Sequence, residues 1–140
     1  MLRLRGVNHI AIICSDYQAS LGFYCNVLGC RIISEEYRAE RRSMMTKLSL
    51  GGEYLIELFT FPDSPDRPSY PEACGLRHLA FTVENLAQTV QELERMGVPH
   101  EPVRTVPNGE QCCFIHDPDG LPIELVSSQP PSSTIGPFYA

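Results

Sequence analysis

Two histidines and two glutamates recur in the same order in the two halves of this 140-residue sequence. His9 begins the segment HIAII and His78 begins HLAFT, while Glu57 lies within LIEL and Glu124 within PIEL. The repeat interval is 69 residues for the histidines (78 − 9) and 67 for the glutamates (124 − 57). Two imidazoles and two carboxylates suit a borderline divalent ion such as Zn, Ni, Co, Mn or Fe. The sequence therefore predicts that these four residues bind one metal ion.

The residues around each glutamate make this pattern difficult to explain by packing alone. Alternate residues of an extended strand share a face, so His9, Ala11 and Ile13 are expected on one side, and Leu55 and Glu57 on one side of another strand. A glutamate inside an apolar strand is unfavourable to bury without a partner. Its repetition together with a histidine favours metal ligation, and a structural or vestigial pair in each half is the alternative.

The other histidines and the cysteines give weaker signals. His116 precedes the turn sequence DPDG and is expected at the surface or behind the site, and His100 is expected to have no partner. The six cysteines contain no C-x-x-C spacing, so we expect small buried side chains rather than disulfides or metal ligands.

Each half predicts a strand, a helix and three further strands. Asp16 is a suitable N-cap for the first helix, and the pair Gly51-Gly52 predicts a tight hairpin turn. The expected helices cover 17–28 and 85–96. The expected strands cover 7–14, 30–37, 44–50, 53–60, 76–83, 98–104, 111–117 and 121–126.

These elements predict one domain over residues 1–127, built from two similar modules. Module one covers about 5–60, a proline-rich linker covers 61–75, and module two covers 76–127. Residues 128–140 are expected to form an irregular tail.

Composition excludes two classes of partner. The formal net charge of −6 disfavours nucleic-acid binding, which depends on clustered Lys and Arg. The longest apolar run, IAII at 10–13, is far shorter than the roughly 20 residues of a membrane span. No signal-peptide pattern is visible, so we expect a cytoplasmic protein with a small-molecule substrate.

Three segments resemble the vicinal oxygen chelate superfamily, which includes glyoxalase I, bleomycin-resistance proteins and extradiol dioxygenases. They are VNHIAIICSDYQASLGFYCNVLGCRI, GLRHLAFTVENL and FIHDPDGLPIEL, and the resemblance extends over about residues 5–127. It is closest to short bacterial glyoxalase-I-like proteins. It implies an α+β fold in which two paired βαβββ modules form a curled mixed-sheet cup around a metal ion, and it implies a homodimer.

The resemblance also implies site roles. The ligands of glyoxalase I follow the order His, Glu, His, Glu, which His9, Glu57, His78 and Glu124 match, with Ni or Zn as the favoured ion and Co, Mn or Fe as alternatives. The implied activity is that of a lactoylglutathione lyase-like isomerase. Glu57 or Glu124 removes a proton next to a carbonyl, and the metal stabilises the enediolate.

One position departs from glyoxalase I. That enzyme commonly carries an Arg four residues after the first ligand His, where it binds the glutathione carboxylate, and Ile13 stands there in this chain. This favours a small substrate that is not linked to glutathione, such as a hydroxy or oxo acid. The alternatives are another vicinal-oxygen enzyme, either an epimerase or an Fe(II) extradiol-type dioxygenase, and a non-catalytic small-molecule binding protein.

Overall fold

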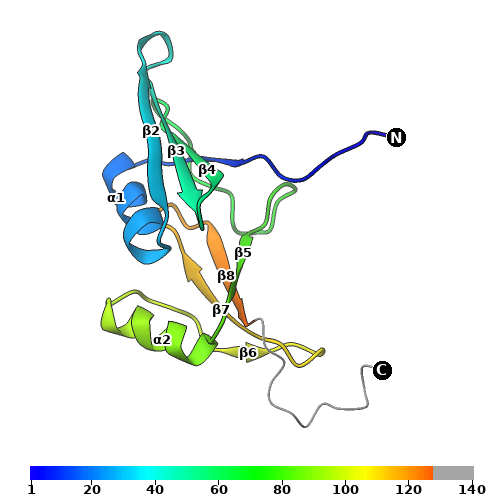
Figure 1. Cartoon of the computed structure of the whole chain (residues 1–140). Coiled ribbons are helices and arrows are strands. Elements are labelled where there is room, and N and C mark those ends of the chain that lie inside the picture. The colour runs from blue at the N-terminus through cyan, green and yellow to red at the C-terminus, as the bar shows by residue number, and fades with distance from the viewer. Residues whose placement is uncertain (128–140) are drawn as a thin grey trace. The chain divides into compact units, whose positions relative to one another are not determined.

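The computed structural model describes residues 1–127 and divides the chain into two compact units. The first unit is Met1–Arg67 and the second begins at Pro68, so their boundary lies inside the predicted linker 61–75. Each unit is built on one four-stranded mixed sheet (Figure 1). The tail predicted for 128–140 lies outside the described residues.

The first unit has the strand order β1-β4-β3-β2, in which β1 is parallel to β4 and the other neighbours are antiparallel. A single helical segment follows β1 and consists of an α-helical part and a π-helical turn. The elements are β1 (Ile10–Ile13), α1 (Tyr17–Gly22), the π-helical turn Phe23–Val27, β2 (Arg31–Arg38), the 3-10 turn Ala39–Arg41, β3 (Ser43–Leu50) and β4 (Glu53–Phe59).

The second unit repeats this topology. Its strand order is β5-β8-β7-β6, in which β5 is parallel to β8 and the other neighbours are antiparallel. The elements are β5 (Leu79–Val83), α2 (Leu86–Arg95), β6 (Arg104–Thr105), β7 (Gln111–His116) and β8 (Pro122–Ser127). The predicted α+β fold of two βαβββ modules is confirmed.

The core of each unit lies on the sheet face that carries the largest aliphatic side chains. In the first unit Leu48, Ile56 and Leu58 are completely buried, and Tyr24 of the π-helical turn is buried with them. In the second unit Ile115, Ile123, Leu125 and Leu93 of α2 are buried. The alternation along β4 and β8 therefore turns the residues between these, including Glu57 and Glu124, to the other face.

One predicted strand is much shorter in the structure. The expected strand 98–104 reduces to β6, a pair of residues, Arg104–Thr105. Pro99 and Pro102 explain the difference, because proline has no N–H for a strand ladder. Strand pairing therefore begins only after the second proline.

The expected burial of the cysteines holds for Cys14, Cys30, Cys112 and Cys113, whereas Cys25 is half-buried and Cys74 is exposed. All six are free. Burial raises the pKa of the Cys30 thiol to about 11, so this thiol is not activated as a nucleophile. No helix among residues 1–127 is long and apolar enough to cross a membrane.

Equivalent side chains cap the two helices. The Asp16 carboxylate accepts a hydrogen bond from the Ala19 N–H at 3.0 Å, and the Asn85 amide oxygen accepts one from the Gln88 N–H at 3.0 Å. Each cap satisfies one of the N–H groups that a helix start leaves without a partner. The predicted N-cap role of Asp16 is confirmed.

The cap of α1 leads to a stability prediction. Asp16→Ala removes the acceptor for the Ala19 N–H and should lower the free energy of unfolding by about 1 kcal/mol. Urea denaturation, monitored by circular dichroism, measures this free energy of unfolding. Asp16→Asn keeps an acceptor and should stay close to wild type, and equal stability of Asp16→Ala and wild type would contradict the role of the cap.

Candidate metal centre

His9 and Glu57 face each other in the first unit. His9 lies one residue before β1 rather than inside the strand, as the expected range 7–14 had placed it. Parallel pairing sets Ala11 opposite Glu57, which brings the start of β1 to the middle of β4. His9 Nε2 lies 3.8 Å from Glu57 Oε2, and the Glu57 side chain is 10% exposed.

The hydrogen bond on the far side of the His9 ring orients it. His9 Nδ1 lies 2.7 Å from Asn8 Oδ1, and an amide oxygen only accepts, so Nδ1 carries the proton. Nε2 is then the ring atom turned to the carboxylate oxygen, where it can bind a cation or, when it carries a proton, form an ion pair with Glu57. A ring fixed through Nδ1 in this way is typical of a metal ligand.

Tyr54 is a third member of this site. Its hydroxyl donates a hydrogen bond to Glu57 Oε2, and its ring stacks on that of His9 at 5.2 Å between centroids. Burial and the neighbouring Glu57 carboxylate raise the pKa of Tyr54 to about 12, which keeps the hydroxyl protonated as a donor. Lys47 lies over the outer side of the Tyr54 ring at 5.5 Å.

A strand irregularity hides Tyr54 from sequence reasoning. Period-2 alternation places residues 54 and 57 on opposite faces of a strand. In β4, however, Ile56 pairs with Leu48 while Tyr54 pairs with the next residue, Ser49, so Leu55 is an extra residue. This bulge turns Tyr54 to the face of Glu57.

His78 and Glu124 form the equivalent pair of the second unit. His78 lies one residue before β5, and Ala80 pairs with Glu124 as Ala11 pairs with Glu57. His78 Nε2 lies 3.0 Å from Glu124 Oε2, and the two side chains are 29% and 20% exposed. Phe114, which pairs with Glu124 across the sheet as Lys47 pairs with Glu57, meets the His78 ring edge-on at 5.3 Å.

The donor sets suit a divalent ion. With bonds of about 2.1 Å, an imidazole nitrogen and a carboxylate oxygen lie about 3.0 Å apart at a right angle and about 3.4 Å apart at the tetrahedral angle. The His78–Glu124 separation of 3.0 Å matches the first of these values. The His9–Glu57 separation of 3.8 Å requires the two atoms to approach by several tenths of an ångström.

The structure thus brings the four predicted ligands together as two pairs. Among residues 1–127, no three or more His, Cys, Asp or Glu side chains gather in a group that could hold a metal ion. Binding of both pairs to a single ion stays a prediction. In each pair the atoms that face each other are Nε2 and Oε2, so each unit places one imidazole nitrogen beside one carboxylate oxygen.

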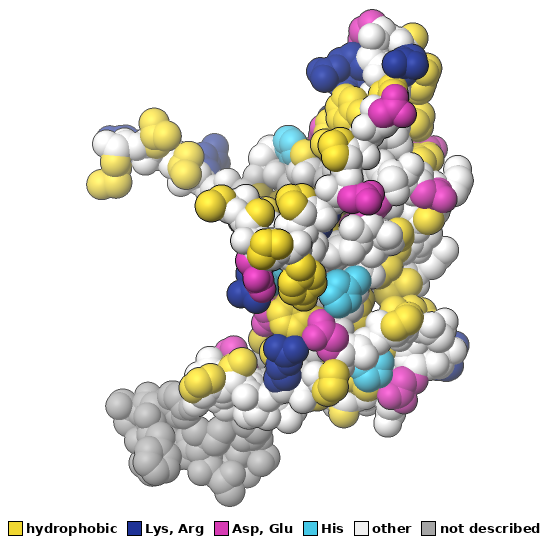
Figure 2. All heavy atoms as spheres, turned by 180° about the vertical axis from the view of Figure 1, so that it is seen from behind, with side chains coloured by type: hydrophobic (Ala, Val, Ile, Leu, Met, Phe, Trp, Pro, Cys, Tyr) yellow, Lys and Arg dark blue, Asp and Glu magenta, His cyan; other side chains and the backbone are white. Residues whose placement is uncertain are grey.

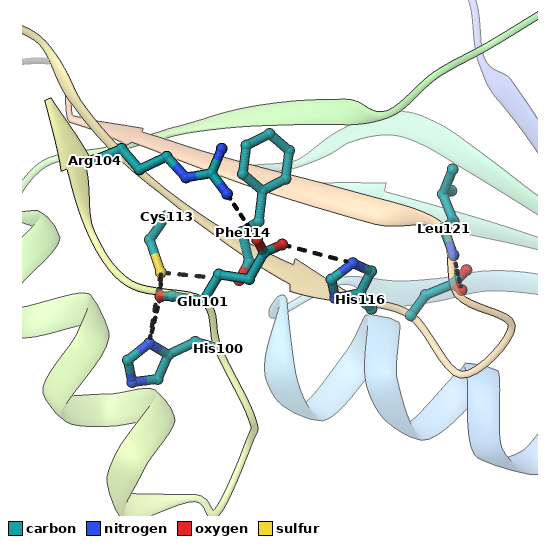
Figure 3. Close-up of polar contacts among 8 residues, drawn as sticks. His100, Glu101, Arg104, Cys113, Phe114, His116 and Leu121 are labelled. Carbon is teal, nitrogen blue, oxygen red and sulfur yellow. Dashed lines mark hydrogen bonds and ion pairs between the residues drawn. The ribbon is translucent and has the colours of Figure 1, made fainter. Parts of the chain in front are cut away.

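His100 has partners, contrary to the expectation that it has none. Its Nδ1 lies 2.9 Å from the Glu101 carbonyl oxygen and its Nε2 lies 3.3 Å from Glu94 Oε1. Cys113 Sγ also lies 3.7 Å from Nδ1 and donates to the same carbonyl (Figure 3). Because Nδ1 donates to that carbonyl, it cannot accept the thiol proton, and burial raises the pKa of Cys113. This contact therefore does not provide a nucleophile.

His116 lies outside both pairs, as expected. It is at the end of β7, its side chain is 45% exposed, and its Nε2 lies 3.8 Å from Glu101 Oε2. Glu101 also forms an ion pair with Arg104 at 2.9 Å, so its carboxylate joins the two side chains (Figure 3).

Known proteins share this arrangement of modules. The sequence profile of the Glyoxalase/Bleomycin resistance protein/Dioxygenase superfamily matches residues 6–125. The chain belongs to this superfamily. Its members typically use a divalent metal ion, and they bind small molecules. The predicted family is therefore confirmed.

Similar members of the superfamily are known from sequence and from structure. The uncharacterized protein YwkD of Bacillus subtilis is 55% identical over 123 residues, which is 87% of this chain and 96% of that protein. A glyoxalase family protein from Enterococcus faecalis has a crystal structure with a TM-score of 0.82 and 42% identity, covering 88% of this chain and 98% of that one. Lactoylglutathione lyase of Salmonella typhimurium is 25% identical over 130 residues, 91% of this chain and 96% of the enzyme.

The contacts of His100 lead to a pH prediction. The Glu101 carbonyl and then Glu94 raise the pKa of His100 above its ordinary 6.5. A raised folded-state pKa stabilises the fold below the unfolded-state value, and this stabilisation is lost as the pH rises through the folded-state value. Wild type should therefore be more stable than Glu94→Gln between about pH 5 and 6, and the difference should disappear at higher pH.

Urea denaturation of the two proteins across this pH range measures the difference. Glu110→Gln changes an exposed carboxylate outside the contact and should show no such profile. A difference that is independent of pH would contradict the assignment of the Glu94–His100 interaction.

Proposed function

We propose that this superfamily member is a metal-dependent isomerase of the glyoxalase I type, with His9, Glu57, His78 and Glu124 as one ligand set for a single divalent ion. The observation that carries the proposal is the repeated His–Glu pair, in which Nε2 faces Oε2 at 3.8 Å and at 3.0 Å. Nickel or zinc is the proposed ion. We propose that the protein acts as a homodimer, since superfamily members often dimerise.

A bound divalent ion would supply Lewis acidity to two neighbouring oxygens of a substrate. Glu57 or Glu124 would then accept the proton from the carbon next to the carbonyl. The same or the opposite carboxylic acid would return that proton to the adjacent carbon, so substrate and product are isomers and no oxidant is consumed. The Tyr54 hydroxyl holds one oxygen of Glu57, which favours Glu124 as the more mobile base.

The proposed substrate is small. Lactoylglutathione lyase of Salmonella typhimurium is a relative at 25% identity, which supports the reaction class. Ile13 stands where glyoxalase I commonly has the Arg for the glutathione carboxylate, and its side chain is exposed on the same face as His9. A hydroxy or oxo acid with vicinal oxygens therefore suits this site better than a glutathione conjugate.

The ligand set leads to a prediction on metal content. His9→Ala and His78→Ala should each lose most of the bound ion, because each removes a nitrogen ligand that no neighbouring residue replaces. Elemental analysis of protein purified without added metal measures the ratio of metal to protein. His116→Ala is the matched control and should keep the wild-type ratio. An unchanged ratio in His78→Ala would refute the ligand assignment.

The proton-transfer step leads to a prediction on activity. The Ni- or Zn-loaded protein should isomerise at least one member of a panel of small 2-oxo acids, hydroxy acids and hemithioacetals. Glu124→Gln should lower kcat by about 10²- to 10⁴-fold, since it removes a general base. Exchange of the substrate C–H proton for deuterium, monitored by NMR in deuterated water, detects the step directly.

Oxygen consumption and substrate binding separate the alternatives. An Fe(II) preference with uptake of oxygen would replace the isomerase with a dioxygenase. Binding of a ligand without turnover or proton exchange under either metal would leave a binding protein and would overturn the proposed reaction.

A further inference from the structure

Two arginines of the first unit lie over a pair of stacked phenylalanine rings. The Phe59 and Phe61 rings stack at 5.8 Å between centroids with an interplanar angle of 9°. The Arg38 guanidinium carbon lies 5.2 Å from the centroid of Phe59, and that of Arg41 lies 5.2 Å from the centroid of Phe61. Cation–π contacts at this distance hold the guanidinium groups in place without neutralising them.

This arginine pair shares a sheet face with the His9–Glu57 pair. Alternate residues of β4 point the same way, so Phe59 lies on the face of Glu57. Cross-strand partners share that face, and Met45 of β3 pairs with Phe59 on one side and with Glu36 of β2 on the other. Arg38 is two residues beyond Glu36 and therefore lies on this face as well. Two residues of β4 separate Phe59 from Glu57 by roughly 7 Å.

Neither arginine has a carboxylate partner within the described residues. No ion pair within 4.0 Å involves Arg38 or Arg41, although Glu36 and Glu40 are close to Arg38 in sequence. Arg38 donates one long hydrogen bond, 3.5 Å to Ser43 Oγ, and its buried Nε has no acceptor. Figure 2 shows Lys and Arg side chains, with Asp and Glu side chains among them, at the connection between β2 and β3, at the top of that view.

The second unit contains an Arg–Phe contact at a different position, on β7 rather than on the strand of the glutamate. Arg104 lies over Phe114 at 5.9 Å, and Phe114 pairs with Glu124 across the sheet. Here Glu101 binds the guanidinium at 2.9 Å (Figure 3). An Arg–Phe contact thus occurs in each unit, at Phe59 of β4 and at Phe114 of β7, and the one in the second unit has a carboxylate partner. Arg38 and Arg41 are positive charges without a carboxylate partner among residues 1–127.

We propose that Arg38 and Arg41 bind an oxyanion, a carboxylate or a phosphate group, carried by the substrate. The planar guanidinium fork matches such groups in two parallel hydrogen bonds, and stacking on aromatic rings pre-organises it. This inference rests on the proposed function, in which the reacting end of the substrate binds at the His–Glu pairs. It adds that the substrate also carries an anionic group, which binds on the sheet face of the His9–Glu57 pair. A substrate of this kind is an acid or a phosphorylated oxo compound rather than a neutral aldehyde.

Anion binding by the full-length, metal-free protein tests this site apart from catalysis. Inorganic phosphate and malonate are the two probes, and isothermal titration gives their Kd values. NMR signals of nitrogen-labelled arginine side chains report which guanidinium groups respond. Arg38→Gln and Arg41→Gln should each weaken binding of the preferred probe by about 10- to 100-fold. Arg104→Gln is the matched control and should bind as wild type, because Glu101 already occupies its guanidinium.

The two probes separate a carboxylate from a phosphate substrate, since the probe that binds with the lower Kd identifies the anionic group that the site prefers. Arg41 is exposed, so Arg41→Gln should keep the fold even if Arg38→Gln lowers stability. Equal affinity in wild type and Arg41→Gln, or no binding of either probe to wild type, would overturn the proposal. His78→Ala should bind the anion normally. Loss of metal in that variant therefore tests the proposed function separately from this site.

Discussion

The site depends on one contact, an imidazole Nε2 that faces a carboxylate oxygen. His9 Nδ1 donates a hydrogen bond to Asn8 Oδ1, so Nε2 is the ring atom turned towards Glu57. A proton or a metal cation between the two atoms makes this contact favourable. The parallel pairing of the first and last strands of each module creates this contact, because it sets the residue before the first strand beside the middle of the last. Repetition of the module repeats the contact.

The two modules share this contact but differ around it. In the first, Tyr54 holds Glu57 and Lys47 covers the Tyr54 ring, whereas in the second the apolar Phe114 borders His78. In the first module the guanidinium groups of Arg38 and Arg41 also have no carboxylate partner among the residues that the structure describes. These differences support the proposal that the first module recognises the substrate and the second carries the more mobile carboxylate.

Sequence reasoning succeeded where the signal is local or duplicated. The repeated HIAII and HLAFT segments, the N-cap at Asp16 and the hairpin at Gly51-Gly52 all follow from short-range rules and agree with the structure. It was wrong for His100, whose partners Glu94 and the Glu101 carbonyl come from a helix and a loop. It missed Tyr54 because a single extra residue in β4 reverses the alternation that the prediction assumed.

The sequence by itself determined the family, the module topology and the identity of the paired His and Glu residues, because alternation, capping and duplication are visible in the order of residues. Only the tertiary structure decided which atoms face each other, that Tyr54 joins Glu57, and that Arg104 is neutralised while Arg38 is not. The physical reason is that these contacts depend on strand register and on bulges. Register is set by the packing of residues far apart in the chain, and one residue of shift moves a side chain to the other face.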